Sequence, residues 1–361
     1  MKVTPKKVLF ITPYPFDSAG SQRFRFEQYF TYLQEHNIFY KQVPFLDQTT
    51  WKIFYKEGKL LIKAWGFVKG LLRRLYCLFI VSAYDRVFIH REAAPIGPPI
   101  IEYIIAKILQ KKIIFDFDDS IWLSDSSTSN TTLRKLKSSG NKTSKIIEYS
   151  YKVYAGNQYL ADYASHYNSN VVVVPTIVNT DHHKPLRNQK KSKICIGWTG
   201  THTTLKHFEA IIPTLEKLYK KHKETIYFKL IANKQVHYDT LDLVSTIWNK
   251  NGEIDQLSEL DIGIMPLPND KWSNGKCGFK AIQYMALEIP TIVSPVGMNT
   301  QLIENNITGF ICESEDEWLM AFETLIANES LRIQMGKKAR QKIINEFSYE
   351  STKDLFVSNL C

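Results

Sequence analysis

The chain has 361 residues, more than one ordinary hydrophobic core accommodates, and 44% of them are hydrophobic, as in a typical globular protein. Its five cysteines are scattered without metal-ligand spacing, which argues against structural zinc and for a reducing compartment. The formal net charge of +10 favours anionic partners. Because the sequence holds no nucleic-acid-binding motif, phosphorylated ligands or an anionic membrane are expected rather than nucleic acid.

The first predicted elements are a strand from Val8 to Thr12, a loop that reaches Gly20, and a helix from Arg23 to His36. A strand, a glycine loop and a helix open many nucleotide-binding domains, although a tight turn explains a single glycine equally well. Arg23 and Arg25 would stand in the first turn of the helix, where cations oppose the helix dipole. Either a nearby anionic ligand or solvent must then compensate these charges.

A long amphipathic helix is predicted from Leu60 to Phe79, after a second strand from Ile38 to Val43. Its apolar stripe is broad, and its polar side carries Lys59, Lys63, Lys69, Arg73 and Arg74. We expect the stripe to pack on the sheet of the first half, as in most amphipathic helices. The alternative is an interfacial helix with its apolar face in a membrane. In either case the basic residues favour weak electrostatic association with an anionic membrane surface.

The next two predicted strands end in polar residues. Arg86 to His90 ends in a histidine, which after a strand is most often structural. Lys112 to Phe115 runs into the acidic cluster Asp116-Phe117-Asp118-Asp119. A haloacid-dehalogenase-type phosphatase and a metal-binding GT-A glycosyltransferase both place a DxD pair after a strand. A helix cap with a turn is a further explanation of the cluster.

The boundary between two domains is predicted near the middle of the chain. Residues 124–144 are rich in Ser, Thr, Asn and Lys and predict a surface loop, which is either a lid over an acceptor or an inert insertion. Residues 176–191 have the composition of an interdomain linker. We therefore expect an N-terminal domain of residues 1–175 and a C-terminal domain of residues 192–361, whose last helix may cross back to the first domain.

The second half restarts the pattern with a strand from Ile194 to Trp198. Thr199, Gly200 and Thr201 follow it, and their hydroxyls and amides are suited to phosphate before a helix. The further predicted elements are a helix over Thr204–His222, strands over Thr225–Ile231 and Leu243–Trp248, and helices over Glu315–Ala327, Leu331–Glu346 and Tyr349–Leu360.

The stretch from Asp261 to Gly297 predicts a buried strand, a polar loop, a helix that opens at Gly278, and a second buried strand. This order is one unit of a doubly wound sheet, in which ligands bind beyond the carboxyl ends of the strands. Lys276 and Lys280 flank the start of the helix. Together with the free amides of that helix, they predict an anion-binding site.

This stretch resembles the donor-binding region of family-4 glycosyltransferases (glycosyl transferases group 1), which are retaining enzymes of the GT-B fold. The segments QYMALEIP and TIVSPVG stand where that family has an EAMACGVP-like helix and a VVAS..GG strand. Two glutamates of the family, which contact the donor sugar and the ribose, correspond to Gly275 and Gln283. The resemblance implies an α/β GT-B architecture of two Rossmann-like doubly wound domains that face a cleft.

The resemblance also implies site residues in both domains. Gln283 can hydrogen-bond a ribose hydroxyl without charge, whereas Trp198 replaces an arginine of the family and Lys206 only loosely matches its lysine. The implied donor-binding residues are Gly20, Thr199, Gly200, Thr201, Lys276, Lys280 and Gln283. On the first domain, the implied acceptor-side residues are Arg23, Arg25 and Asp116, and the implied catalytic residues are His90, Asp118 and Asp119.

The implied function is transfer of a sugar from a nucleotide-sugar donor to a glycan or lipid-linked acceptor, with retention of configuration and without a metal or another cofactor. Lys276 and Lys280 would stabilise the departing diphosphate. A non-catalytic GT-B protein that binds a nucleotide sugar is the alternative, motivated by the missing glutamates, and a DxD phosphatase is a third hypothesis. Because no signal peptide or membrane span is evident, the expected location is the cytoplasm, including the inner face of a membrane.

Overall fold

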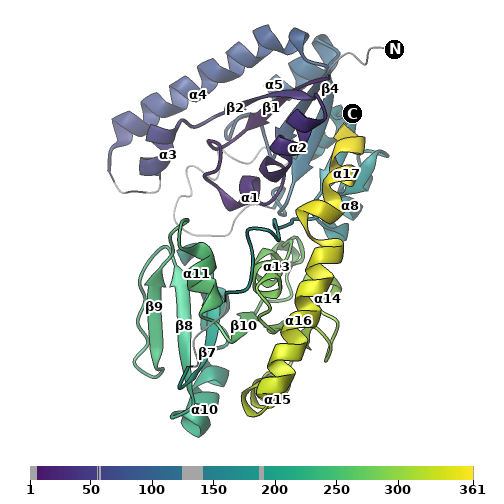
Figure 1. The fold of residues 1–361 in the computed structure, drawn as a ribbon. Helices are drawn as coiled ribbons and strands as arrows, with labels where there is room; N and C mark the ends of the chain where they lie inside the picture. The colour runs from purple at the N-terminus through teal and green to yellow at the C-terminus, as the bar shows by residue number, and fades with distance from the viewer. Residues whose placement is uncertain (1–5, 55, 57, 124–140, 187–190, 361) are drawn as a thin grey trace. The chain divides into compact units, whose positions relative to one another are not determined.

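The computed structural model describes residues 6–54, 56, 58–123, 141–186 and 191–360 (Figure 1). The chain divides into two compact units: Met1–Thr176 together with Thr352–Cys361 forms unit 1, and Ile177–Ser351 forms unit 2. Each unit contains a six-stranded parallel sheet with helices, which confirms the predicted α/β class. Of the predicted surface loop at 124–144, residues 124–140 lie outside the described residues.

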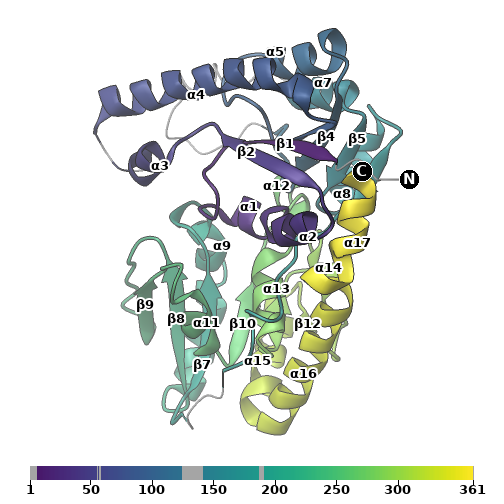
Figure 2. The same cartoon turned by 45° about the horizontal axis from the view of Figure 1, so that its top comes forward.

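Unit 1 has the strand order β2-β1-β3-β4-β5-β6. The strands are β1 (Lys7–Thr12), β2 (Phe39–Pro44), β3 (Arg86–His90), β4 (Lys112–Phe117), β5 (Lys152–Ala155) and β6 (Val171–Val173). The α-helices among the described residues before 176 are α1 (Gly20–Arg23), α2 (Phe30–Glu35), α3 (Gln48–Phe54), α4 (Leu60–Ile80), α5 (Ile100–Tyr103), α7 (Lys142–Tyr149) and α8 (Gln158–Ser165). Figure 2 shows α4, α5 and α7 over one face of the sheet, with α1 and α2 on the other side.

The predicted single helix over Arg23–His36 is wrong. The segment is divided into α1, a short 3-10 helix and α2. Its residues Phe24, Arg25, Phe26 and Glu27 are all buried. Successive residues of an α-helix point about 100° apart, so one helical face cannot bury four in a row, and the chain turns instead.

The helix α4 forms as predicted, but the expected packing of its apolar stripe on the sheet is wrong. The buried residues of α4 are Gly66, Gly70, Arg74 and Cys77. A Cβ atom built on Gly66 would lie 2.3 Å from the side chain of Thr50, so only a glycine allows this approach. The helix therefore docks through its small residues, and its large apolar side chains point elsewhere.

Arg74 anchors α4 through its guanidinium group, which is buried in unit 1. It donates hydrogen bonds to the carbonyl oxygens of Thr12 at 2.7 Å and Val43 at 2.9 Å, and also to that of Ala93. Thr12 is the last residue of β1, Val43 lies near the end of β2, and Ala93 follows β3. A single cation thus satisfies backbone acceptors at three neighbouring strand ends, because its planar donors point in several directions.

The last helix, α17 (Tyr349–Leu360), contributes its residues from Thr352 onward to unit 1. Phe356 is buried and stacks on Tyr29, with ring centroids 4.2 Å apart. The hydroxyl of Tyr154 donates to the carbonyl of Phe356 at 2.8 Å. The end of the chain therefore completes the core of the first sheet, more than 170 residues after the rest of that unit.

Unit 2 has the strand order β12-β11-β10-β7-β8-β9. The strands are β7 (Ile194–Thr199), β8 (Ile226–Ala232), β9 (Leu243–Ile247), β10 (Ile262–Met265), β11 (Thr291–Val293) and β12 (Gly309–Ile311). The helices are α9 (Leu205–Glu209), α10 (Ile212–His222), α11 (Glu253–Ser258), α12 (Lys271–Asn274), α13 (Phe279–Ala286), α14 (Asn299–Leu302), α15 (Glu315–Ala327) and α16 (Glu329–Glu346). The predicted single helix over Thr204–His222 is wrong, because a proline in the first turn of α10 separates it from α9.

Two buried clusters form the core of unit 2. One includes Trp198, Leu215 and Phe322 and joins β7 to α10 and α15. The other includes Cys195 and Tyr284 and joins β7 to α11 and α13. Both clusters use successive residues of the same strands, as expected for a parallel sheet covered on both faces.

We predict that Phe356→Ala lowers the free energy of unfolding of unit 1 by about 3–5 kcal/mol, because the change leaves a cavity against Tyr29. Urea denaturation, together with hydrogen exchange of β1 and β3, measures the effect. The control is Leu355→Ala on the exposed side of the same helix, which should change stability by less than about 0.5 kcal/mol. Equal effects of the two substitutions would contradict the packing of α17 on unit 1.

Candidate active site

Both sheets contain a point at which the strand order reverses. In unit 1 it lies between β1 and β3, and in unit 2 between β7 and β10. Ligands of open α/β sheets bind beyond the carboxyl ends of the strands at such points. The residues predicted from the sequence follow these strands or their neighbours: Gly20, Arg23, Arg25, His90, Asp116, Asp118 and Asp119 in unit 1, and Thr199, Gly200, Thr201, Lys276, Lys280 and Gln283 in unit 2.

The loop after β7 is held by hydrogen bonds within unit 2. The amide of Thr199 donates to the hydroxyl of Tyr284 at 2.8 Å, and that of Gly200 donates to the carbonyl of Ile231 at 3.0 Å. The amide of Thr201 donates to the hydroxyl of Thr204 at 3.1 Å. These backbone donors are therefore engaged with the protein, and the loop acts as a rigid support beside the reversal point.

Three lysines place positive charge near one buried histidine, His207, which the sequence analysis did not single out. Burial lowers the pKa of His207 first, and the charges of Lys280, Lys206 and Lys276 lower it further, to about 4. The predicted pair Lys276 and Lys280 thus affects the same histidine as Lys206, which follows the β7 loop. A concentration of cations at a reversal point suits a phosphorylated ligand. A histidine beside Lys206 in the helix after β7 was the available sequence signal.

Aromatic rings support the two predicted lysines. The ammonium of Lys280 lies 5.6 Å from the centre of the buried Trp198 ring, and that of Lys276 lies 5.0 Å from the ring of Trp272. Cations over aromatic faces are attracted by the ring quadrupole. Trp198, which takes the place of an arginine in the resemblance, therefore positions a cation instead of supplying one.

The segment from β10 to α14 carries buried polar atoms that no described residue satisfies. They are Nε2 of Gln283, Oγ of Ser273 and Oδ1 of Asn299. Buried polar groups almost always have a hydrogen-bond partner, so each such atom calls for an explanation. All three atoms belong to the stretch of the chain that also carries Lys276 and Lys280.

Glycines shape the same segment. Gly278 precedes α13 with φ of 68°, and Gly297 has φ of 54°, a left-handed conformation that favours glycine. A Cβ on Gly297 would lie 2.7 Å from the carbonyl oxygen of Asn274. The chain after β11 therefore approaches the backbone of the β10 loop as closely as it can. Gly275, where the resembled family has a glutamate, is buried in that loop.

At the reversal point of unit 1, a buried network joins three of the predicted residues. Nδ1 of His90 lies 2.6 Å from Oδ2 of Asp116, and Arg25 forms an ion pair with the same carboxylate. Burial would raise the pKa of Asp116, but the charge of Arg25 and the hydrogen bond from His90 outweigh it and lower the pKa. Arg25 is thus compensated by a protein carboxylate, neither by solvent nor by a free anion.

The ionised Asp116 orients the ring of His90. Since a carboxylate only accepts hydrogen bonds, Nδ1 of His90 carries the proton, which leaves Nε2 as the free ring position. Nε2 is buried and finds no hydrogen-bond partner among the residues that the structure describes. The predicted catalytic residue therefore presents one oriented, unsatisfied nitrogen at the carboxyl end of β3.

The remaining predicted residues of unit 1 lie around this network. Asp118 accepts a hydrogen bond of 2.8 Å from Arg91, and the charge of Arg91 lowers the pKa of Asp118 against the opposing effect of burial. Asp119 accepts a hydrogen bond from the amide of Ser120 at 3.1 Å. A local contact of this kind is typical of a turn, which was one explanation of the acidic cluster. Arg23 contacts Asp17 at 3.4 Å, and Gly20 is exposed at the start of α1.

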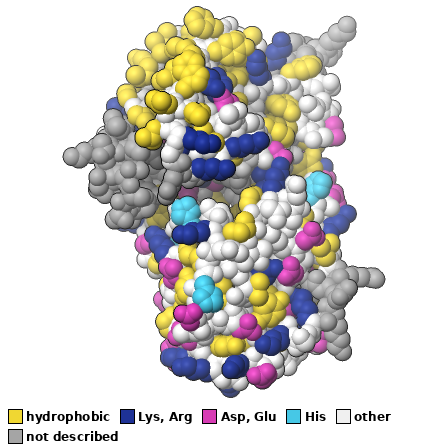
Figure 3. All heavy atoms as spheres, turned by 90° about the vertical axis from the view of Figure 1, so that its left-hand side faces the viewer, with side chains coloured by type: hydrophobic (Ala, Val, Ile, Leu, Met, Phe, Trp, Pro, Cys, Tyr) yellow, Lys and Arg dark blue, Asp and Glu magenta, His cyan; other side chains and the backbone are white. Residues whose placement is uncertain are grey.

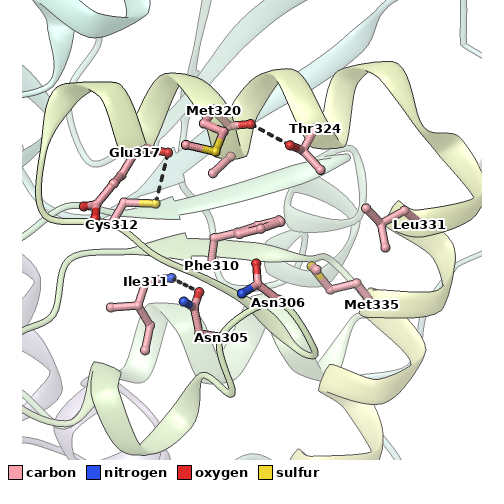
Figure 4. A pocket seen from close by; sticks show the side chains of 11 residues that line it. Asn305, Asn306, Phe310, Ile311, Cys312, Glu317, Met320, Thr324, Leu331 and Met335 are labelled. Carbon is pink, nitrogen blue, oxygen red and sulfur yellow. Dashed lines mark hydrogen bonds between the residues drawn. The ribbon is translucent and has the colours of Figure 1, made fainter.

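A pocket of about 320 Å³ lies elsewhere in unit 2, against the edge strand β12 (Figure 4). Phe310, Met320 and Met335 line it, and no predicted site residue does. Its charged residue, Glu317, uses its carboxylate to accept from the amides that begin α15. The pocket offers no cation for a phosphate, so it does not compete with the lysine cluster.

Comparisons with known proteins address the fold and the family. Residues 241–342, which include the loop from β10 to α13, match the family model of glycosyl transferases group 1. A search of curated proteins finds no match. The fold is similar to that of a glycosyltransferase from Rickettsia africae ESF-5, with a TM-score of 0.68 and 14% identity over 98% of both chains.

Two further solved structures have the same architecture. HepE from Anabaena, in complex with UDP and glucose, matches with a TM-score of 0.67 and 12% identity over 98% of this chain and 99% of that chain. Sucrose-phosphate synthase from Thermosynechococcus elongatus matches with a TM-score of 0.61 and 11% identity, over 97% of this chain and 87% of that chain. The two Rossmann-like units exclude the GT-A interpretation of the acidic cluster, which requires a single nucleotide-binding domain. The chain has the GT-B fold, and its residues 241–342 match the glycosyl transferases group 1 family.

Proposed function

We propose that the protein transfers a sugar from a nucleoside diphosphate sugar to a glycan or lipid-linked acceptor, with retention of configuration and without a metal. The observation that carries the proposal is the lysine cluster around His207, next to three unsatisfied polar atoms at the reversal point of unit 2. UDP-sugars are the first donors to test, because HepE, which has the same fold, was solved with UDP-glucose.

The donor is proposed to bind unit 2 through its diphosphate. In the reaction, the bond between the anomeric carbon and the diphosphate oxygen breaks, and its electron pair stays on the diphosphate. Lys276 and Lys280 would stabilise the charge that develops there, the role expected of preorganised cations in group transfer. Nε2 of Gln283 is suited to donate to a ribose hydroxyl, which would supply its missing partner.

Unit 1 is proposed to supply the groups that act on the reacting sugar and the acceptor. Nε2 of His90 is oriented by Asp116 and is suited to bind a sugar hydroxyl. Asp118 stays ionised beside Arg91 and can orient an acceptor hydroxyl as a hydrogen-bond acceptor. This scheme assigns Asp116 to the orientation of His90 and Asp118 to the acceptor, and it requires no metal ion.

Gly275 distinguishes this chain from the resembled family, because the side chain that contacts the donor sugar there is missing here. Incubation of the purified protein with UDP-sugars, followed by detection of released UDP, tests the proposed function. Release of UDP supports transfer or hydrolysis of the donor. Binding without any release, across the common nucleoside diphosphate sugars and candidate acceptors, would instead favour a protein that only binds nucleotide sugars.

The first prediction is that Lys276→Ala and Lys280→Ala each weaken UDP binding about tenfold or more, since each removes a charge-assisted contact to phosphate. Isothermal titration calorimetry measures the dissociation constant. The matched control is Lys221→Ala, which removes an exposed lysine of α10 that pairs with Glu323 in the same unit. Unchanged affinity in both site variants would show that the diphosphate binds elsewhere.

The second prediction concerns the pKa of His207, which lies at about 4 in the absence of a ligand. Bound UDP adds negative charge beside the three lysines, so the protonated imidazole becomes less unfavourable, and the pKa should rise by about one unit. NMR titration of the imidazole measures it, with the exposed His166 as the unaffected control. If the pKa of His207 does not change at a saturating UDP concentration, the donor does not bind at the lysine cluster.

The third prediction is that His90→Gln and Asp118→Asn lower turnover by about tenfold to a thousandfold, while UDP binding changes less than about threefold. Both residues are assigned to the reacting sugar and acceptor, not to the diphosphate. His166→Gln, a change of an exposed histidine in the same unit, should leave both quantities unchanged. Activity should persist in EDTA. Complete loss in EDTA that manganese restores would refute the metal-free scheme.

A further inference from the structure

The helix α4 exposes a continuous row of large apolar side chains. Leu61 is 87% exposed, Phe79 is 82% exposed and Trp65 is 59% exposed. We call this surface the α4 apolar face; its residues are Leu60, Leu61, Ile62, Trp65, Val68, Leu71, Leu72, Leu75, Tyr76 and Phe79. Soluble monomers rarely expose contiguous apolar patches of this kind unless the patch binds something.

The exposure follows from how α4 is docked. Gly66, Gly70, Arg74 and Cys77 recur at intervals of four, four and three residues, so they form one side of the helix, and that side is buried. The apolar face lies on the opposite side. Because the glycines and Arg74 already make the contacts with unit 1, the apolar residues cannot turn inward without breaking those contacts.

The charges around the face identify the kind of surface that it fits. The sequence of α4 contains no acidic residue. Lys69 and Arg73 lie together on one flank of the helix, between the apolar face and the docked side, whereas Lys63 falls within the docked side. Lys69 and Arg73 share a single carboxylate, that of Asp47, at 2.9 Å and 3.0 Å, so this flank keeps a net positive charge. At the top of the view in Figure 3, hydrophobic side chains form a patch, and Lys and Arg side chains lie next to it.

An apolar ridge with cations along one flank matches the boundary of an anionic bilayer, where acyl chains lie beneath negatively charged headgroups. Trp65 and Tyr76 are residue types that favour this boundary. A second copy of the chain fits less well, because a symmetric pairing would bring cations of the same flanks together. No helix among the described residues is long and apolar enough to cross a membrane, so α4 would lie in the plane of the surface.

We propose that α4 docks the protein on an anionic phospholipid membrane by inserting the α4 apolar face among the acyl chains, with Lys69 and Arg73 at the level of the phosphates. The proposal rests on unit 1 alone and does not depend on the proposed glycosyl transfer. It goes beyond electrostatic attraction by the net charge, because insertion of apolar side chains makes part of the binding resistant to salt.

Vesicle flotation of the full chain tests the proposal, using phosphatidylglycerol mixed with phosphatidylcholine, and phosphatidylcholine alone. We expect binding to the anionic vesicles, weaker binding to neutral ones, and a residual bound fraction in 0.5 M salt, a concentration of about three times the physiological value. Leu72→Glu and Phe79→Glu should each lower partitioning about tenfold or more, since each places a charge where an apolar side chain inserts. The matched control is Met320→Glu, which changes an exposed apolar residue of α15 in unit 2 and should alter partitioning less than twofold.

Tryptophan fluorescence provides a second readout that does not depend on the charge substitutions. Lipids with brominated acyl chains should quench the fluorescence of the parent protein, and Trp65→Phe should remove most of that quenching. Trp248→Phe, a change in unit 2, should retain it. Equal flotation of the parent and both Glu variants, or quenching unaffected by Trp65→Phe, would refute insertion of α4. Absence of vesicle binding together with a dimer that Leu72→Glu dissociates would instead assign the face to a second copy.

Discussion

The reversal of strand order in each parallel sheet is the constraint on which the candidate sites depend. Parallel strands end at the same edge, and helices that leave adjacent strands in opposite directions cannot fill the space beyond that edge. In unit 2 the reversal lies between β7 and β10, and in unit 1 between β1 and β3. Polar residues such as Lys276 and His90 follow these strands, so the topology alone brings chemistry from distant parts of the sequence to one edge of each sheet.

The carboxyl edges of the two sheets differ in how their charges are balanced. In unit 1 the buried charge of Arg25 is balanced within the protein by Asp116, and the same carboxylate orients His90. Removing one member would leave an uncompensated buried charge, so stability and orientation of the site are coupled there. In unit 2 burial lowers the pKa of His207, and the charges of three lysines lower it further against the opposing charge of Asp270. The unit 1 edge thus balances its buried charges within the protein, whereas the unit 2 edge favours an anion.

Much of the fold was predictable, because the apolar strands and their turns are local patterns. The β10 to β11 stretch allowed both the family and the lysine pair to be identified. The predictions failed where burial depended on distant contacts. Phe24 to Glu27 are buried on several sides, which breaks the expected helix, and the buried partner of Arg25 is 91 residues away. The position of His207 beside Lys206 was its one sequence signal, because Lys276 and Lys280 are brought near it only by folding.

The helix α4 shows why an amphipathic pattern does not by itself identify the buried side. Such a pattern is usually interpreted by the size of its apolar residues, which are assumed to face the core. In α4 the small residues Gly66 and Gly70 give the closer approach, and Arg74 donates hydrogen bonds to backbone carbonyls at the strand ends. When a helix packs on the protein through its glycines, its large apolar residues stay exposed and can contact another surface. Spacing of small residues on the polar side of a stripe is therefore the sequence signal that separates the two cases.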